Sequence, residues 1–184
     1  MRRFTTVSPQ VWTSQRFAAL PNDTARMLYL YFLTSPHQTS IGCHRAPVAY
    51  VCADTGLTAA AYTAALANLS KADLVKASKV TGEVLILRWF KHSPPTNAKH
   101  YLGAFKLTQG IEDEEFREET VTELNDAWGQ ALQRMEPQNR VTAARATNYT
   151  LVADLAAESQ GPKPGAVSIA LMENIRNRVN SQIR

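Results

Sequence analysis

The chain has few cysteines, no long apolar run and no secretory signal, and each absence removes a class of protein. Two cysteines, Cys43 and Cys52, occur in 184 residues and form no pair motif, so we do not expect a disulfide framework. No apolar segment approaches the roughly 20 residues that span a membrane. The start, MRRFTTVSPQVW, carries two arginines without the apolar core of a secretory signal. We therefore expect a cytoplasmic protein with no membrane partner.

Sequence motifs of catalysis are also missing. The chain has no glycine-rich phosphate loop, no nucleophile elbow and no paired metal-binding carboxylates. His37, Cys43, His44 and Cys52 are residue types that bind zinc, but their spacing matches no common zinc finger or ribbon. We expect a non-catalytic protein that needs no metal and no cofactor.

Charge is distributed unevenly along the chain. Residues 1–110 carry 12 Lys and Arg against 4 Asp and Glu, whereas residues 111–136 carry 2 against 9. Residues 137–184 return to a basic balance, with 6 against 3. A basic N-terminal part favours an acidic partner such as DNA, and the acidic block lies just outside it.

One stretch, Ala46–Leu87, carries the strongest structural signal. A short helix pattern begins after Pro47 and ends at Gly56, which is suited to a left-handed C-cap. Thr58 then caps a second helix, and a hairpin pattern follows around Thr81-Gly82. Helix, tight turn, helix and two-stranded wing are the order of a winged helix-turn-helix. An ordinary helical hairpin is the alternative.

The remaining patterns predict a mostly α protein: a winged helix-turn-helix domain with a small β-wing, followed by additional helices. We expect a short helix over Pro9–Leu20 with Trp12 near the core, and a central helix from Asn22 or Asp23 to Thr34. Further helices are expected over Ala98–Thr108 and Asp113–Met135. The expected divisions are a DNA-binding domain over 1–95, a helical extension with the acidic helix over 96–136, a linker with a short helix over 137–165, and a basic amphipathic helix over 166–184.

Candidate DNA-contacting residues fall into two groups. The second helix of the motif leaves Thr58, Thr63 and Asn68 for a groove, with Lys71 as its only cation, which is a weak set for reading base edges. Cations gather around the motif instead, where they can hold phosphates: Arg45 before it, Lys76 and Lys79 on the wing, and Arg88 and Lys91 after it. A solvated basic surface is the alternative.

Two further segments have competing interpretations. Trp89 and Phe90 lie between Arg88 and Lys91, where aromatic rings can stack on unpaired bases, but we favour a place in a small core. The acidic run Glu112–Glu119 begins a helix, where the helix dipole favours negative charge, and we expect it to be a solvated face.

Leu28–Asn97 resembles the N-terminal domain of phage-encoded replication proteins of the replisome-organiser or replication-initiator type. The matching segments are LYLYFLTSPHQTSIGCHRAPVAYVCADTGLT and VLILRWFKHSPPTN, of which LYLYFLTSPH and IGCHRAPVAY are the more specific. The resemblance implies a winged helix that binds origin DNA or self-associates, and a second region that recruits a helicase or its loader. By wing position it implies DNA contacts for Lys76, Lys79, Arg88 and Lys91.

The sequence therefore favours a non-catalytic protein that binds double-stranded DNA in phage or prophage replication initiation or replisome organisation. One alternative is a winged-helix transcriptional regulator. Another is a protein-interaction module whose winged helix does not touch DNA, which the neutral second helix supports. Val167, Leu171, Ile175, Val179 and Ile183 recur at i+4 spacing, so self-association through the C-terminal helix is also expected.

Overall fold

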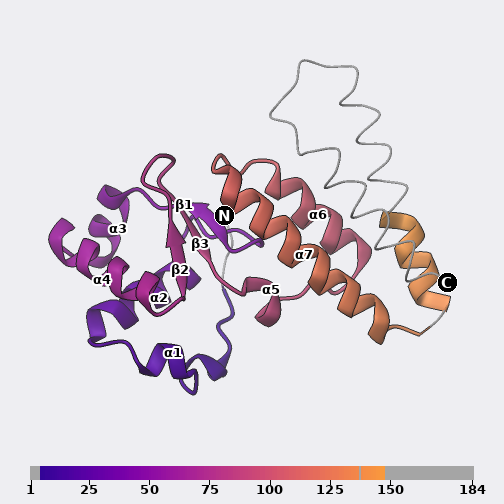
Figure 1. Cartoon of the computed structure of the whole chain (residues 1–184), viewed down its shortest axis with the longest axis horizontal. Coiled ribbons are helices and arrows are strands. Elements are labelled where there is room, and N and C mark those ends of the chain that lie inside the picture. The colour runs from indigo at the N-terminus through magenta and orange to yellow at the C-terminus, as the bar shows by residue number, and fades with distance from the viewer. Residues whose placement is uncertain (1–4, 137, 148–184) are drawn as a thin grey trace, which may run out of the picture.

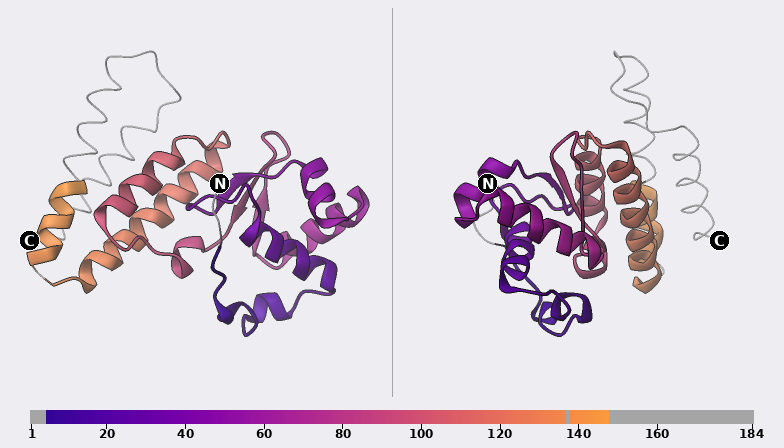
Figure 2. Two further views of the ribbon diagram at one scale, coloured as in Figure 1. Left: turned by 180° about the vertical axis from the view of Figure 1, so that it is seen from behind. Right: turned by 60° about the vertical axis from the view of Figure 1, so that its left-hand side comes forward.

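The computed structural model describes residues 5–136 and 138–147. The elements formed by these residues lie in three layers (Figure 1). Helices α2, α3 and α4 form one layer, a small sheet forms the middle, and α6 with α7 forms the other. Figure 2 shows the same order from two further sides. The helix expected over 166–184, and most of the linker expected over 137–165, lie outside the described residues. Residues 138–147 of that linker are helical.

The first layer begins with two short helical turns and continues into the winged-helix elements. Asn22 caps α2 by accepting the backbone N–H of Ala25, and Thr58 caps α4 by accepting that of Ala61. The elements are η1 (Pro9–Val11), α1 (Gln15–Ala18), α2 (Asp23–Thr34), β1 (Cys43–Arg45), α3 (Val48–Thr55), α4 (Ala59–Lys71), β2 (Val75–Ala77) and β3 (Glu83–Ile86).

The three strands form an antiparallel sheet in the order β1-β3-β2. Leu85 of the central strand lies opposite Cys43 on one side and Lys76 on the other. The wing is thus a β2–β3 hairpin, and β1 completes the sheet from the segment before the helix-turn-helix. This arrangement confirms the expected winged helix-turn-helix with a small β-wing in a mostly helical protein.

Successive residues of β3 point to opposite faces of the sheet, and both faces are covered. Val84 and Ile86 belong to a core with Leu28, Leu69 and other side chains of α2, α3 and α4. Leu85 belongs to a second core that lies between the sheet and α6 and α7. All four residues of β3 are therefore buried, whereas a strand of an antiparallel sheet commonly has one face in solvent.

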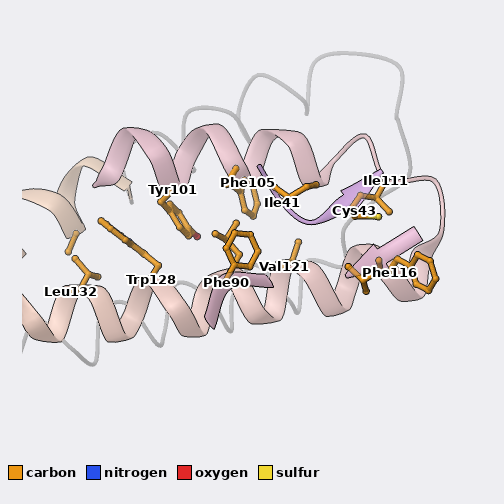
Figure 3. Packing of buried hydrophobic residues seen from close by; sticks show 14 residues of the cluster. Ile41, Cys43, Phe90, Tyr101, Phe105, Ile111, Phe116, Val121, Trp128 and Leu132 are labelled. Atoms are coloured by element: carbon orange, nitrogen blue, oxygen red, sulfur yellow. The ribbon is translucent and has the colours of Figure 1, made fainter. Parts of the chain in front are cut away.

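The helices on the far side of the sheet from α4 are called the second layer. They are α5 (Trp89–His92), α6 (Ala98–Thr108) and α7 (Glu114–Arg134). Its core holds a stack of aromatic rings, with Tyr101 and Trp128 only 5.3 Å apart between centroids (Figure 3). Phe90 is buried among them, which confirms its expected place in the core. Trp89 is half-buried and donates its indole N–H to the Ser40 carbonyl at 2.8 Å. A domain boundary was expected from the sequence at position 95, and this core includes buried residues from both sides of that position.

The carboxylate of Glu83 fastens the second layer to the wing. Glu83 is 4% exposed, and its two oxygens accept the backbone N–H groups of Glu112 (3.0 Å) and Asp113 (2.8 Å), just before α7 begins. The Thr81 hydroxyl donates a third bond to it at 2.9 Å. A buried carboxylate is costly unless it is bonded in this way, so Glu83 fixes where α7 starts.

The N-terminal expectations need one correction. The expected helix over Pro9–Leu20 is broken into η1 and α1 because the Ser14 side chain caps a new helix by accepting the Phe17 N–H. Trp12 falls in the break and is 65% exposed, so its expected place near the core is wrong. The helices expected over Ala98–Thr108 and Asp113–Met135 are confirmed as α6 and α7.

Among the described residues, no helix combines the length and the apolar character needed to cross a lipid bilayer.

Replacing Glu83 by Gln should lower the free energy of unfolding by about 1–3 kcal/mol, since an amide nitrogen would then face backbone N–H donors in a buried site. Urea denaturation measures the loss. Glu118→Gln removes an exposed carboxylate from α7 and should change stability by less than about 0.5 kcal/mol. Equal stability of the two variants would contradict the role given to Glu83.

Candidate nucleic-acid interface

The helix-turn-helix is built from local interactions that the sequence specifies. Gly56 ends α3 in the left-handed region, with φ +73°, and its N–H bonds to the Cys52 carbonyl. Thr58 begins α4 two residues later, and Tyr62, Ala65 and Leu69 bury one stripe of that helix. The opposite stripe of α4 is left at the surface.

The exposed side of α4 is small and neutral. Ala59, Ala60, Ala64 and Ala67 are exposed, and Lys71 at the C-terminal end is the only cation. The polar side chains expected to read bases are already engaged or half-buried. The Thr58 hydroxyl caps the helix, the Thr63 hydroxyl donates to the Ala59 carbonyl at 2.9 Å, and Asn68 is half-buried.

The turn of the wing is held by backbone hydrogen bonds. Ser78 N–H donates to the Glu83 carbonyl at 2.8 Å, and Gly82 N–H donates to the Ser78 carbonyl at 3.1 Å. Gly82 has φ +70°, which favours glycine. Lys79 and Val80 are exposed in this turn, and Val80 is 95% exposed.

Arg45 and Lys76 lie on the opposite face of the sheet, against α7. The Lys76 ammonium contacts Glu119 at 2.7 Å and Glu115 at 2.9 Å, and these hydrogen bonds raise the pKa of Lys76 above its usual value. Arg45 contacts Glu112 at 3.3 Å. The interpretation of the acidic run as a solvated face is therefore wrong in part, because its carboxylates pair with sheet cations.

Arg88 is held at the other end of the hairpin. It adopts the left-handed region, with φ +60°, and its guanidinium contacts the Asp73 carboxylate at 2.6 Å and bonds the Asp73 carbonyl. Asp73 is itself in the left-handed region, with φ +55°, so the ion pair joins two turn residues. Lys91 is exposed on α5, and no ion pair of it occurs among the described residues.

The structure thus places the predicted site residues in different surroundings. Thr58, Thr63, Asn68 and Lys71 follow α4 along one side of the first layer. Arg45 and Lys76 face α7, and Arg88 is paired with Asp73. Of the predicted cations, those without an ion pair within residues 5–136 and 138–147 are Lys71, Lys79 and Lys91.

The acidic groups of the first layer and the sheet are all engaged. Asp23 pairs with Arg26 at 2.8 Å, and Asp54 accepts the Tyr31 hydroxyl at 2.7 Å. Asp73 and Glu83 are engaged as described above. Asp23 and Asp73 pair with arginines, whereas Asp54 and Glu83 bond neutral groups and keep their negative charge.

The histidines and cysteines do not gather into a metal site in the described part of the chain, where no group of three potential ligands occurs. Cys43 is buried, and burial raises the pKa of its thiol to about 12. His44 is 5% exposed beneath Phe32, with Ser35 Oγ 3.5 Å from its Nε2. Burial, and secondarily the nearby His37, lower the pKa of His44 to about 4.

Two features of this region were missed from the sequence. The exposed ring of Tyr50 stacks on His37, with centroids 5.7 Å apart, although the two residues are 13 positions apart. Glu83 binds the start of α7 across 29 and 30 positions. The sequence offers no signal for the stack of Tyr50 on His37. The only signal for the Glu83 contact is a lone acidic residue in a β-rich segment.

No protein-family model matches the chain, and neither the curated proteins nor the solved structures include a significant match to it.

The buried His44 predicts a pH dependence of stability. Between about pH 6.5 and 4 the unfolded chain binds a proton at this position and the native chain does not, so the free energy of unfolding falls as the pH falls. The full effect is up to about 3 kcal/mol. Denaturation of the parent and of His44→Gln at several pH values measures it. The variant should show a shallower decline over this range, and parallel curves would contradict the assignment.

Proposed function

We propose that this chain is a non-catalytic protein that binds duplex DNA through α4 and the wing turn. The observation that carries the proposal is the order α2-β1-α3-α4-β2-β3, in which the outer side of α4 remains exposed, with Lys71 at its end and Lys79 in the wing turn. A helix of this position fits a major groove, and the wing lies beside it. Lys71 and Lys79 are then placed to hold phosphates.

The same surface favours contacts to the DNA backbone over base readout. Thr58 and Thr63 use their hydroxyls within α4, and the exposed alanines offer only methyl contacts, for example to thymine. Phosphate contacts carry little sequence information. We therefore propose binding with weak sequence preference by this domain alone.

A role in replication initiation or replisome organisation rests on the resemblance of Leu28–Asn97 to phage replication proteins. A transcriptional regulator is the alternative within the same DNA-binding class. Replication predicts binding at clustered repeats near an origin and capture of a helicase or its loader, whereas regulation predicts binding at a promoter. Footprinting on genomic DNA from the source separates the two.

Removing Lys71 and Lys79 together should weaken duplex binding on all sequences. Each phosphate contact contributes roughly 0.9 to the slope of log K against log salt concentration, so Lys71→Ala with Lys79→Ala should flatten the slope by about 2. Fluorescence anisotropy of a labelled duplex across a salt series measures the slope.

The matched control is Lys99→Ala with Lys106→Ala. It removes the same charge from exposed positions on α6, which lies beyond the sheet from α4 (Figure 1). The control should bind nearly as the parent does. Equal losses in the two double variants would contradict a defined DNA face. An absence of duplex binding by the parent at low salt would favour the protein-interaction module supported by the neutral side of α4.

The two wing lysines should behave differently. Lys79→Ala should lower affinity and reduce the salt slope by about 1, because Lys79 is exposed and makes no ion pair with any described residue. Lys76→Ala should leave the slope unchanged, because Glu115 and Glu119 already hold its ammonium. The same anisotropy series compares the two single variants. A larger loss for Lys76→Ala would place the α7 side of the sheet on DNA.

A further inference from the structure

An exposed pair of aromatic rings lies at the start of α3 and has no part in either core. The Tyr50 residue is 57% exposed and its ring stacks on the ring of His37, which is exposed too. The centroids are 5.7 Å apart and the planes are inclined by 26°. Tyr50 is among the few large side chains of the described residues that remain mainly exposed.

Both rings are attached to backbone that is held by hydrogen bonds. Tyr50 lies in the first turn of α3, where its N–H bonds to the Pro47 carbonyl at 2.9 Å. His37 lies in the turn after α2, where its N–H bonds to the Ser35 hydroxyl at 3.3 Å and Gln38 N–H bonds to the Ser35 carbonyl at 3.1 Å. A pair fixed in this way loses little conformational freedom when another flat group stacks on it.

The wing turn lies beside this pair. Ala46 N–H donates to the Gly82 carbonyl at 2.9 Å, which joins the turn to the residues that lead into α3. Figures 1 and 2 show the hairpin loop next to α3 from each side. The loop adds the ammonium of Lys79 and the nearly fully exposed side chain of Val80.

Cations and acids both lie near the pair. Arg45 precedes Ala46, and its side chain is 61% exposed although it contacts Glu112 at 3.3 Å. An exposed ion pair of that kind is weak, so a phosphate can replace Glu112. Asp54, the acid of α3, accepts the Tyr31 hydroxyl and keeps its negative charge, so Lys79 is the cation near the pair that has no ion pair within the described residues.

We propose that His37, Tyr50 and the wing turn form a platform that binds the unpaired bases of single-stranded DNA. Every base presents a flat face to an aromatic ring, while Lys79 and Arg45 hold the neighbouring phosphates. Base faces inside a duplex are stacked on one another and do not meet such a ring. The inference goes beyond duplex binding by α4 and does not depend on it.

The experiment compares two strands of equal length with the full chain. One is a labelled oligothymidine of roughly 16 nucleotides and the other is an abasic strand with the same phosphates. Fluorescence anisotropy gives both dissociation constants at one salt concentration. Stacking predicts tighter binding of oligothymidine, whereas equal binding of the two strands overturns the proposal.

Variants place the effect on the pair. Tyr50→Ser should weaken oligothymidine binding about 5- to 150-fold, which corresponds to about 1–3 kcal/mol for one stacked base. Tyr50→Phe should keep most of the affinity because the ring remains. His37→Ala should weaken it by a smaller factor. Trp12→Ser, which removes another exposed aromatic ring near α1, is the matched control and should bind as the parent does.

Each outcome separates this proposal from the proposed duplex binding. Loss of single-strand binding in Tyr50→Ser with duplex binding intact supports the platform. Equal affinity of Tyr50→Ser and the parent for oligothymidine overturns it, whatever the duplex result. Concentration-dependent sedimentation that Tyr50→Ser abolishes, without any change in DNA binding, would identify a contact between copies and would also overturn it. Unfolding midpoints of all variants show whether each one is folded.

Discussion

Burial of β3 on both faces is the constraint on which the arrangement of this protein depends. A strand with side chains alternating between two covered faces has no position left for a solvated residue, so Glu83 must find partners in the interior. It finds them in the backbone N–H groups of Glu112 and Asp113. The wing strand thereby determines where α7 begins, and the second layer is not an independent appendage of the first.

The same alternation decides which cations remain available. Arg45 and Lys76 share the face of Glu83 and Leu85, so their side chains meet the acidic first turns of α7. Lys79 lies in the turn, outside the register, and is free of this pairing. A count of charge along the sequence treats the three residues alike, whereas the pleat of the sheet separates them.

Most of the fold follows from local sequence signals. Asn22, Gly56 and Thr58 act as caps where the sequence places them, and the stripes of α4 and α7 face the cores. The candidate site was less predictable, because ion pairs such as Lys76 with Glu119 join residues 43 positions apart. The helix expected over Pro9–Leu20 failed for a local reason. Its apolar residues are spaced as in one helix, but the Ser14 side chain caps a new helix and breaks it at Trp12.

The energies of these contacts separate the interactions that stabilise the fold from those that would affect the proposed DNA binding. The Glu83 bonds are buried, so losing one leaves an unsatisfied group and costs stability. The Lys76 and Arg45 ion pairs are more exposed, and such pairs contribute about 1 kcal/mol or less. They are therefore weak as attachments for α7. Lys76 has two carboxylate partners, whereas Arg45 has one exposed partner. The carboxylates that precede and begin α7 therefore add little to stability, and they leave Lys71, Lys79 and Lys91 as the predicted cations without an ion pair in the described part of the chain.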